Sequence, residues 1–156
     1  MHTHLIAVGK LRPAYRDLCN DYLKRLGRYT KIEEREIREA GRAPTPAHRR
    51  REETARIEAA LPPRATVIVL DIGGAPWSTE ELARRLGVWR DSAASVALII
   101  GGAFGLDPGF TARAPFRWSL GALTFPHELA RVIVAEQWYR AWTMLRGEPY
   151  HKGGTA

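Results

Sequence analysis

Glycine-rich segments follow apolar, strand-like runs at three places in the chain. They lie at residues 70–74, 101–105 and 120–125. In open α/β sheets, ligands bind beyond the carboxyl ends of the strands, and glycine lets the backbone approach a ligand closely. These segments contain no lysine or arginine, and their spacing matches neither a dinucleotide-binding fingerprint nor a P-loop. The pattern therefore predicts an apolar, uncharged pocket suited to an adenosine-bearing cofactor without phosphates.

Few side chains in the sequence could act as an acid or a base. His127 stands where the last helix is expected to begin, Glu136 lies within that helix, and His151 is near the end of the chain. A histidine at a helix start more often binds backbone than substrate. Glu136 has apolar neighbours, where an unpaired charge is costly, and Arg140 four residues later is its natural partner. The sequence leaves open whether this pair is structural or faces a substrate.

Metal and thiol chemistry are both disfavoured by the sequence. His2 and His4 could bind a metal ion only with further ligands, and none is spaced along the chain to help. No Cys/His cluster has zinc-site spacing, and no Ser-His-Asp set lies in a nucleophile elbow. The single cysteine, Cys19, falls in an apolar helical series, so we expect a core residue in a reducing compartment. We expect no metal site.

Strand and helix patterns alternate along the chain. Apolar runs predict strands at residues 5–9, 66–71 and 95–100, and a weak alternation predicts another at residues 31–39. Helical spacing predicts helices over residues 13–26, 48–61, 79–89 and 126–145. Ser78 and Glu81 form a capping-box pattern for the third helix. The β-branched strand 66–71 is of the type buried on both faces, which is typical of a parallel sheet. The chain is thus predicted to be a single domain, residues 1–156, with an α/β fold whose mostly parallel sheet is flanked by helices.

The last predicted helix is apolar around much of its circumference. A helix that packs on one sheet needs an apolar stripe of only about 100°. The helix over residues 126–145 is therefore expected to be covered on a second side, and a homodimer would bury the same patch twice. The alternative is a helix that is central to the core of the monomer.

The chain carries a formal net charge of +7, which favours an acidic partner such as nucleic acid. Arg42, Arg49, Arg50 and Arg51 fall on a predicted loop and helix start, where they could contact phosphates. The alternative is a solvated basic face. No signal-peptide pattern or membrane-spanning apolar run is present, so we expect a cytoplasmic protein without a membrane partner.

Five ordered motifs run from residue 70 to residue 152. They are Leu70-Asp71-Ile72-Gly73-Gly74 with Trp77-Ser78, Ile99-Ile100-Gly101-Gly102 with Gly105, Ser119-Leu120 with Ala122-Leu123-Thr124-Phe125-Pro126-His127, Arg131-Val132 with Glu136-Gln137 and Tyr139-Arg140-Ala141, and Pro149-Tyr150-His151-Lys152. Together they resemble the RlmH family of small bacterial SPOUT methyltransferases.

This resemblance implies a fold, a reaction and a set of cofactor contacts. The fold would be a SPOUT-type α/β knot with a deep C-terminal trefoil. The reaction would be methyl transfer from S-adenosylmethionine to N3 of pseudouridine 1915 in helix 69 of 23S rRNA, performed by a homodimer on assembled 70S ribosomes. The motifs place the cofactor contacts on Leu70, Gly102, Leu120, Gly121, Ala122, Leu123, Thr124 and Phe125.

For the reaction itself, the enzyme must hold N3 and the electrophilic methyl group at near-attack distance. The N3 proton must also leave, so a positioned base or a field that favours the anion would help. We hypothesise that Arg140, Tyr150 and His151 shape the uridine site, with the tail of one protomer covering the pocket of the other. Two alternatives stay open: a knotted methyltransferase acting on a different RNA such as tRNA, and a ribosome-binding factor with a decayed cofactor site.

Overall fold

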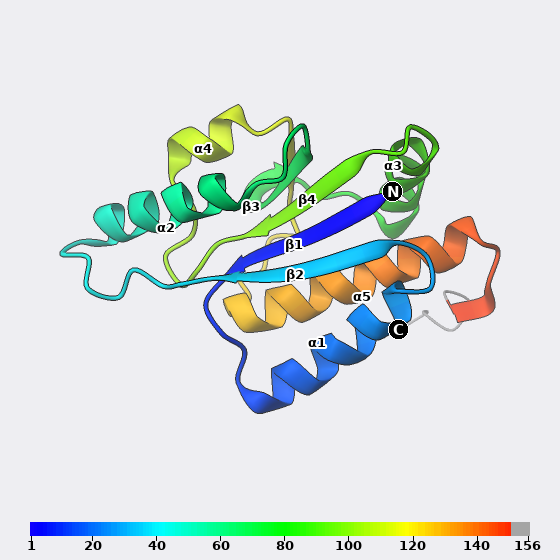
Figure 1. The fold of residues 1–156 in the computed structure, drawn as a ribbon, viewed down its shortest axis with the longest axis horizontal. Coiled ribbons are helices and arrows are strands. Elements are labelled where there is room, and N and C mark those ends of the chain that lie inside the picture. The colour runs from blue at the N-terminus through cyan, green and yellow to red at the C-terminus, as the bar shows by residue number, and fades with distance from the viewer. Residues whose placement is uncertain (151–156) are drawn as a thin grey trace.

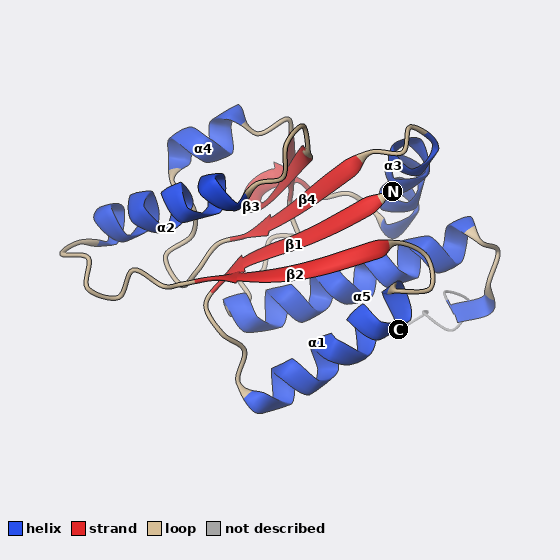
Figure 2. Cartoon of the chain, viewed as in Figure 1, coloured by secondary structure: helices blue, strands red, loops and turns tan. Residues whose placement is uncertain are grey.

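The computed structural model describes residues 1–150, which form one five-stranded sheet with helices on both faces (Figures 1 and 2). The strands are β1 (His2–Val8), β2 (Lys31–Ile37), β3 (Thr66–Ala75), β4 (Ser95–Ile100) and β5 (Phe116–Trp118). Their order is β2-β1-β4-β3-β5, and every neighbouring pair is parallel. The predicted α/β fold with a parallel sheet is confirmed.

Five helices cover this sheet on both sides. They are α1 (Pro13–Leu26), α2 (Pro46–Ala60), α3 (Thr79–Asp91), α4 (Pro108–Arg113) and α5 (His127–Leu145). Alternate residues of β1 point to opposite faces: Leu5 and Ala7 pack with α1, α3 and α5, whereas Ile6 and Val8 pack with α2 and α4. Both faces of the sheet are therefore apolar, as the β-branched strand pattern predicted.

The helix starts follow local capping chemistry. α2 begins two residues earlier than predicted because Pro46 suits the first turn and the Thr45 side chain accepts a hydrogen bond from the His48 N–H. At α3 the Ser78 hydroxyl accepts from the Glu81 N–H at 3.1 Å, as the capping box predicted. The Glu81 carboxylate, which in a full capping box accepts from the Ser78 N–H, binds Arg85 instead.

Helix α4 was not predicted, and β5 was recognised only as a strand-like run before residue 120, without bounds. They contain six and three residues, too few for a period to be recognised. β3 also runs four residues beyond its predicted end, because Trp118 of β5 pairs first with Leu70 and then with Ala75. The intervening residues 71–74 bulge out of the ladder at the edge where the glycine segments meet.

The apolar circumference of α5 is covered within the chain itself. Helix α5 lies against the sheet and packs on both α1 and α3. Trp138 is fully buried, and its indole N–H donates to Thr3 Oγ1, while Val132 and Ala135 pack on Cys19 of α1. Helices α1 and α3 thus supply much of the second cover, as the alternative of a helix central to the monomer predicted, and the homodimer stays a prediction. No helix within residues 1–150 is long and apolar enough to cross a membrane.

A buried arginine joins α5 to the end of the sheet. Arg131 has no solvent exposure, and its guanidinium donates to Glu36 at 2.7 Å, to Glu34 at 3.1 Å and to the carbonyl of Gly9 at 2.9 Å. Arg16 of α1 binds the same two carboxylates. This network holds α1, α5 and β2 around the carboxyl end of β1.

Candidate functional site

A cleft opens at the carboxyl ends of β3, β4 and β5, the edge where ligands of parallel sheets bind. Its open space is about 660 Å³, including the part that faces solvent. Seven of the eight predicted cofactor contacts line it: Leu70, Gly102, Leu120, Gly121, Leu123, Thr124 and Phe125. Ala122 belongs to the same loop but is exposed and is not part of the lining.

The wall formed by the loop after β4 depends on glycines at positions 101, 102 and 105. A Cβ on Gly101 would lie 2.9 Å from the carbonyl carbon of Gly105, and a Cβ on Gly102 would lie 3.0 Å from Val8. Gly105 has a φ of +80°, and its N–H donates to the Gly102 carbonyl at 3.0 Å. The loop therefore closes tightly and presents backbone, not side chains, to the cleft.

The bulge of β3 forms the opposite wall. It places Asp71 and Ile72 in the lining, two residues that were not among the predicted contacts although the adjacent glycines marked the segment. Asp71 Oδ2 accepts from Arg117 Nη2 at 2.5 Å and from Nε at 2.9 Å. Gly74 is needed because a Cβ there would lie 2.5 Å from the carbonyl oxygen of Arg117. The single acidic side chain of the lining is thus already paired.

The loop after β5 completes the cleft. Gly121 has a φ of +115°, its N–H donates to Ser119 Oγ, and the Ser119 hydroxyl donates to the Gly121 carbonyl, both at 3.1 Å. His127, the first residue of α5, also lines the cleft and does not only start the helix. At the rim, Leu123 is 72% exposed and Ile72 is 61% exposed, which marks an apolar surface for a ligand or partner.

These walls fit the predicted cofactor class. Leucine, isoleucine and phenylalanine side chains supply apolar surface for a base and ribose, and the glycine loops supply backbone donors and acceptors. Among residues 1–150, no lysine or arginine lines the cleft, so these walls offer no cation to a phosphate group. The site suits an adenosine-bearing molecule without phosphates.

The predicted catalytic residues lie elsewhere on the chain. Arg140 binds Glu136 Oε1 through Nη2 at 2.6 Å and through Nε at 2.8 Å, which confirms the predicted pair. Its guanidinium lies 4.9 Å from the Tyr150 ring centre, and the Tyr150 hydroxyl donates to the same Glu136 oxygen. At 1.5 Å per residue, Arg140 is about 15 Å along α5 from Ala130, where the cleft ends. His151 lies outside the described residues.

Both described members of this group stay protonated near neutral pH. Burial raises the pKa of Tyr150 far above its usual value, and its contacts with Tyr22 and Glu136 add to the rise. Burial disfavours the charge on Arg140, but its hydrogen bond with Glu136 outweighs this effect and raises its pKa. Arg140 is therefore a fixed cation and Tyr150 a hydrogen-bond donor, and neither is a general base.

The four candidate RNA-binding arginines differ in their surroundings. Arg49 is largely buried between Glu53, Glu39 and the ring of Phe104, so its charge is used within the protein. Arg42 and Arg51 are exposed and Arg50 is half-buried. Among residues 1–150, no ion pair joins these three to an acidic side chain. Three of the four are thus available to phosphate.

Comparison with known proteins gives consistent results along the whole chain. Residues 1–151 match the family described as predicted SPOUT methyltransferases. Ribosomal RNA large subunit methyltransferase H of Pseudomonas paraeruginosa is 44% identical over 155 residues, covering 97% of this chain and 100% of that protein. The protein of the same name from Thioalkalivibrio sulfidiphilus is also 44% identical, covering 97% and 99%.

A solved structure supports the fold. The probable methyltransferase from Bordetella pertussis superposes with a TM-score of 0.57 at 18% identity, covering 89% of this chain and 95% of that one. At this identity the likeness concerns the fold alone.

Proposed function

The chain belongs to the SPOUT methyltransferase family, and from that premise we propose that it methylates N3 of a pseudouridine in helix 69 of 23S rRNA, on 70S ribosomes, with S-adenosylmethionine as the donor. One observation carries the proposal. The chain is 44% identical over 97% of its length to ribosomal RNA large subunit methyltransferase H, and its cleft is lined by residues of the motifs on which the resemblance rests. Family membership also implies the trefoil knot, which we propose for the C-terminal part.

We assign the cofactor to the cleft at the ends of β3, β4 and β5. When bound there, S-adenosylmethionine supplies a methyl group on a positively charged sulfur. Leu70, Gly102 and the loop of residues 120–125 would hold it, with glycine backbone close to its polar groups. The apolar walls exclude water from the methyl group and leave the target nitrogen as the favoured nucleophile.

The residues of this chain have two tasks in the transfer. They must align N3 of the base with the methyl carbon, so that the new N–C bond forms as the C–S bond breaks and its electron pair stays on sulfur. They must also favour loss of the N3 proton, which passes to water or a base. A fixed cation such as Arg140 lowers the cost of the N3 anion, and the protonated Tyr150 can donate a hydrogen bond to a uracil oxygen.

We propose a homodimer because Arg140 and Tyr150 lie far from the cleft of their own chain. Arg140 is about 15 Å along α5 from the cleft wall, and Tyr150 packs beside it, so these two residues act at a cleft only if a second copy brings its own. The exposed rim residues Ile72 and Leu123 offer apolar surface for that copy to cover.

Subunit complementation tests this arrangement. Gly102→Val disables the cleft and Arg140→Ala disables the proposed cation, so each variant alone should be inactive. In an equal mixture that is allowed to exchange subunits, half the dimers are mixed and one of their two sites is intact, so about a quarter of wild-type turnover should return. A mixture that stays inactive, with mixed dimers present, would show that Arg140 does not serve the partner's cleft.

The basic surface of Arg42, Arg50 and Arg51 is proposed to bind rRNA phosphates. Replacing all three with glutamine should weaken 70S binding and reduce the slope of log affinity against log salt by about 0.7–0.9 per lost contact. The matched control replaces exposed arginines distant in sequence from this surface, Arg28, Arg64 and Arg84. Equal slopes for the two triple variants would reject this surface.

The substrate assignment is tested by offering purified acceptors with labelled S-adenosylmethionine. We expect methyl transfer to 70S ribosomes that lack the modification and none to free tRNA. Calorimetry with S-adenosylmethionine separates this from the ribosome-binding alternative, for which no cofactor binding is expected. Transfer to tRNA instead would identify a different RNA methyltransferase.

A further inference from the structure

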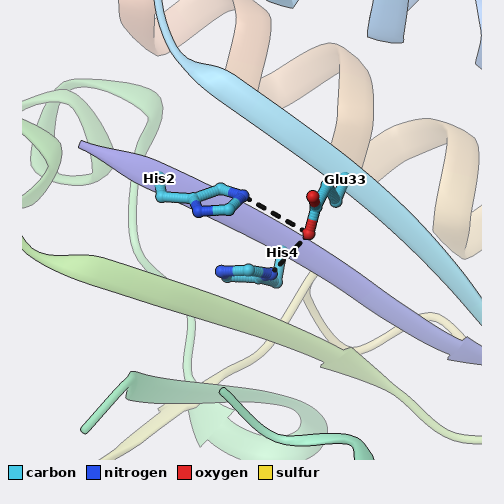
Figure 3. A group of neighbouring side chains, drawn as sticks. All are labelled: His2, His4 and Glu33. Carbon is cyan, nitrogen blue, oxygen red and sulfur yellow. Dashed lines mark ion pairs between the residues drawn. The ribbon is translucent and has the colours of Figure 1, made fainter. Parts of the chain in front are cut away.

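Two histidines and a glutamate meet on the sheet, at the amino ends of the strands (Figure 3). His2 and His4 lie on the same side of β1, and the parallel register places Glu33 of β2 opposite His4. Along the chain no third ligand was expected, because Glu33 is 29 residues beyond His4 and only the strand pairing brings it close.

This part of the sheet is left open by the helices. His2 and His4 continue the side of β1 that carries Ile6 and Val8, which α2 and α4 cover. Arg35, which pairs with Ile6, already binds the carbonyl of Ala60, the last residue of α2. Helix α2 ends at Ala60, so it does not extend over the imidazoles of His2 and His4.

Both imidazoles point at one carboxylate oxygen. Glu33 Oε2 is 3.4 Å from His2 Nε2 and 3.4 Å from His4 Nδ1. These separations are longer than ordinary hydrogen bonds. Within residues 1–150, His2 Nε2 is buried and has no hydrogen-bond partner. A buried nitrogen without a hydrogen bond costs stability, so the position of His2 Nε2 needs a partner that residues 1–150 do not supply.

The same distances fit a metal ion. Zinc binds histidine nitrogen and carboxylate oxygen at about 2.0–2.1 Å in a tetrahedron, and two corners of that tetrahedron are therefore about 3.4 Å apart. All three ligand atoms lie within 4.8 Å of one another, so small side-chain rotations would complete the set. Two histidines and one glutamate leave a fourth position for water.

We propose that His2, His4 and Glu33 bind one divalent transition-metal ion, with zinc as the best match to the ligand set. The ion would clamp β1 to β2, the edge strand that pairs with β1 alone. Its role is structural, because His4 pairs with Ala97, four residues and about 13 Å along β4 from the cleft residue Gly101.

The charges around the group set the affinity. Lys31 Nζ lies 4.0 Å from the other oxygen of Glu33, and Arg35 is also near. These two cations repel a dication and weaken its binding, so removing one of them should strengthen the site.

Titration of the tag-free full chain with zinc chloride tests the site. We expect one equivalent to bind, and His4→Gln or Glu33→Gln to weaken binding by at least about tenfold. Lys31→Gln should strengthen binding, and His48→Gln, on exposed α2, should leave it unchanged. Zinc binding that is absent from the wild type, or equal in all variants, would overturn the proposal.

Cobalt(II) provides a second readout that does not depend on affinity. Four-coordinate cobalt gives intense visible bands, which we expect for the wild type and not for Glu33→Gln. The weak bands of six-coordinate cobalt in the wild type would contradict the tetrahedral site. Circular dichroism of each variant shows whether it is folded, so that a lost site is distinguished from a lost fold.

Discussion

Replacing Gly101 with alanine will weaken S-adenosylmethionine binding by about five- to 150-fold. The added Cβ would meet the backbone of Gly105 at 2.9 Å, and backbone cannot move aside as a flexible side chain can. Relieving an overpacked contact of this type costs about 1–3 kcal/mol, which corresponds to that range of affinity. The loop after β4 would have to open, and it forms one wall of the cleft.

Calorimetric titration with S-adenosylmethionine measures this effect directly. Gly41→Ala is the matched control, because a Cβ on Gly41 meets nothing within 4 Å and the residue lies in the loop before α2. We expect the control to bind as the wild type does. Equal affinities for Gly101→Ala and Gly41→Ala would show that the cofactor does not depend on this loop.

Replacing Arg131 with methionine will lower the free energy of unfolding by about 3–5 kcal/mol. The guanidinium is fully buried between Glu34, Glu36 and the carbonyl of Gly9, and its removal leaves carboxylates that were desolvated around it. Arg16 remains bound to both carboxylates, which favours the lower end of the range. Urea denaturation of both proteins gives the difference.

The same variant should alter the dependence of stability on pH. Burial tends to raise the pKa of Glu36, but its hydrogen bond and charge interaction with Arg131 outweigh this and lower it below 4.5. A carboxyl whose pKa is lowered by folding stabilises the protein above 4.5 and loses that contribution as the pH falls through the folded value. Arg131→Met should therefore lose less stability between pH 5 and pH 3 than the wild type.

A surface pair supplies the control for Arg131. Arg90 and Asp91 are ion-paired at 3.0 Å on the exposed end of α3. Arg90→Ala should cost less than about 1 kcal/mol, as exposed pairs do. A loss for Arg131→Met as small as for Arg90→Ala would contradict the assigned role of the buried network.

The sequence predicted the parts of this fold that have a long period or a clear cap. Strand β4 was predicted with its exact bounds, and α1 likewise, because apolar runs and a proline start mark them. α4 was missed and β5 was given no bounds, because six and three residues carry no readable period. The bulge after Leu70 was missed for a different reason, since it depends on pairing with Trp118, a partner distant in sequence.

The cleft was predicted better than the residues around it. The glycine segments identified its walls because glycine is required wherever backbone approaches backbone, as at Gly101 and Gly74. Asp71 and His127 lay in the marked segments but were not assigned to the cleft, since their place in the lining follows from the bulge and from the entry of α5. Arg49 was taken with its neighbours as one basic surface, although Glu53, four residues later, was a visible partner.

The apolar last helix shows that composition alone does not identify what covers a helix. Counting apolar residues on α5 indicated a second cover, but it could not say whether the cover came from a partner or from the same chain. The structure shows α1 and α3 packed on α5, and the homodimer stays a prediction that the distance between Arg140 and the cleft supports independently. Subunit complementation tests whether Arg140 of one protomer serves the cleft of its partner.

The most direct test of the proposed function is mass mapping of helix 69 from cells with and without this gene. We expect one methyl group on the pseudouridine in the wild-type strain, its absence in the deletion strain, and its return with the wild-type gene but not with Gly102→Val. Helix 69 with the same mass in both strains would contradict the proposed function.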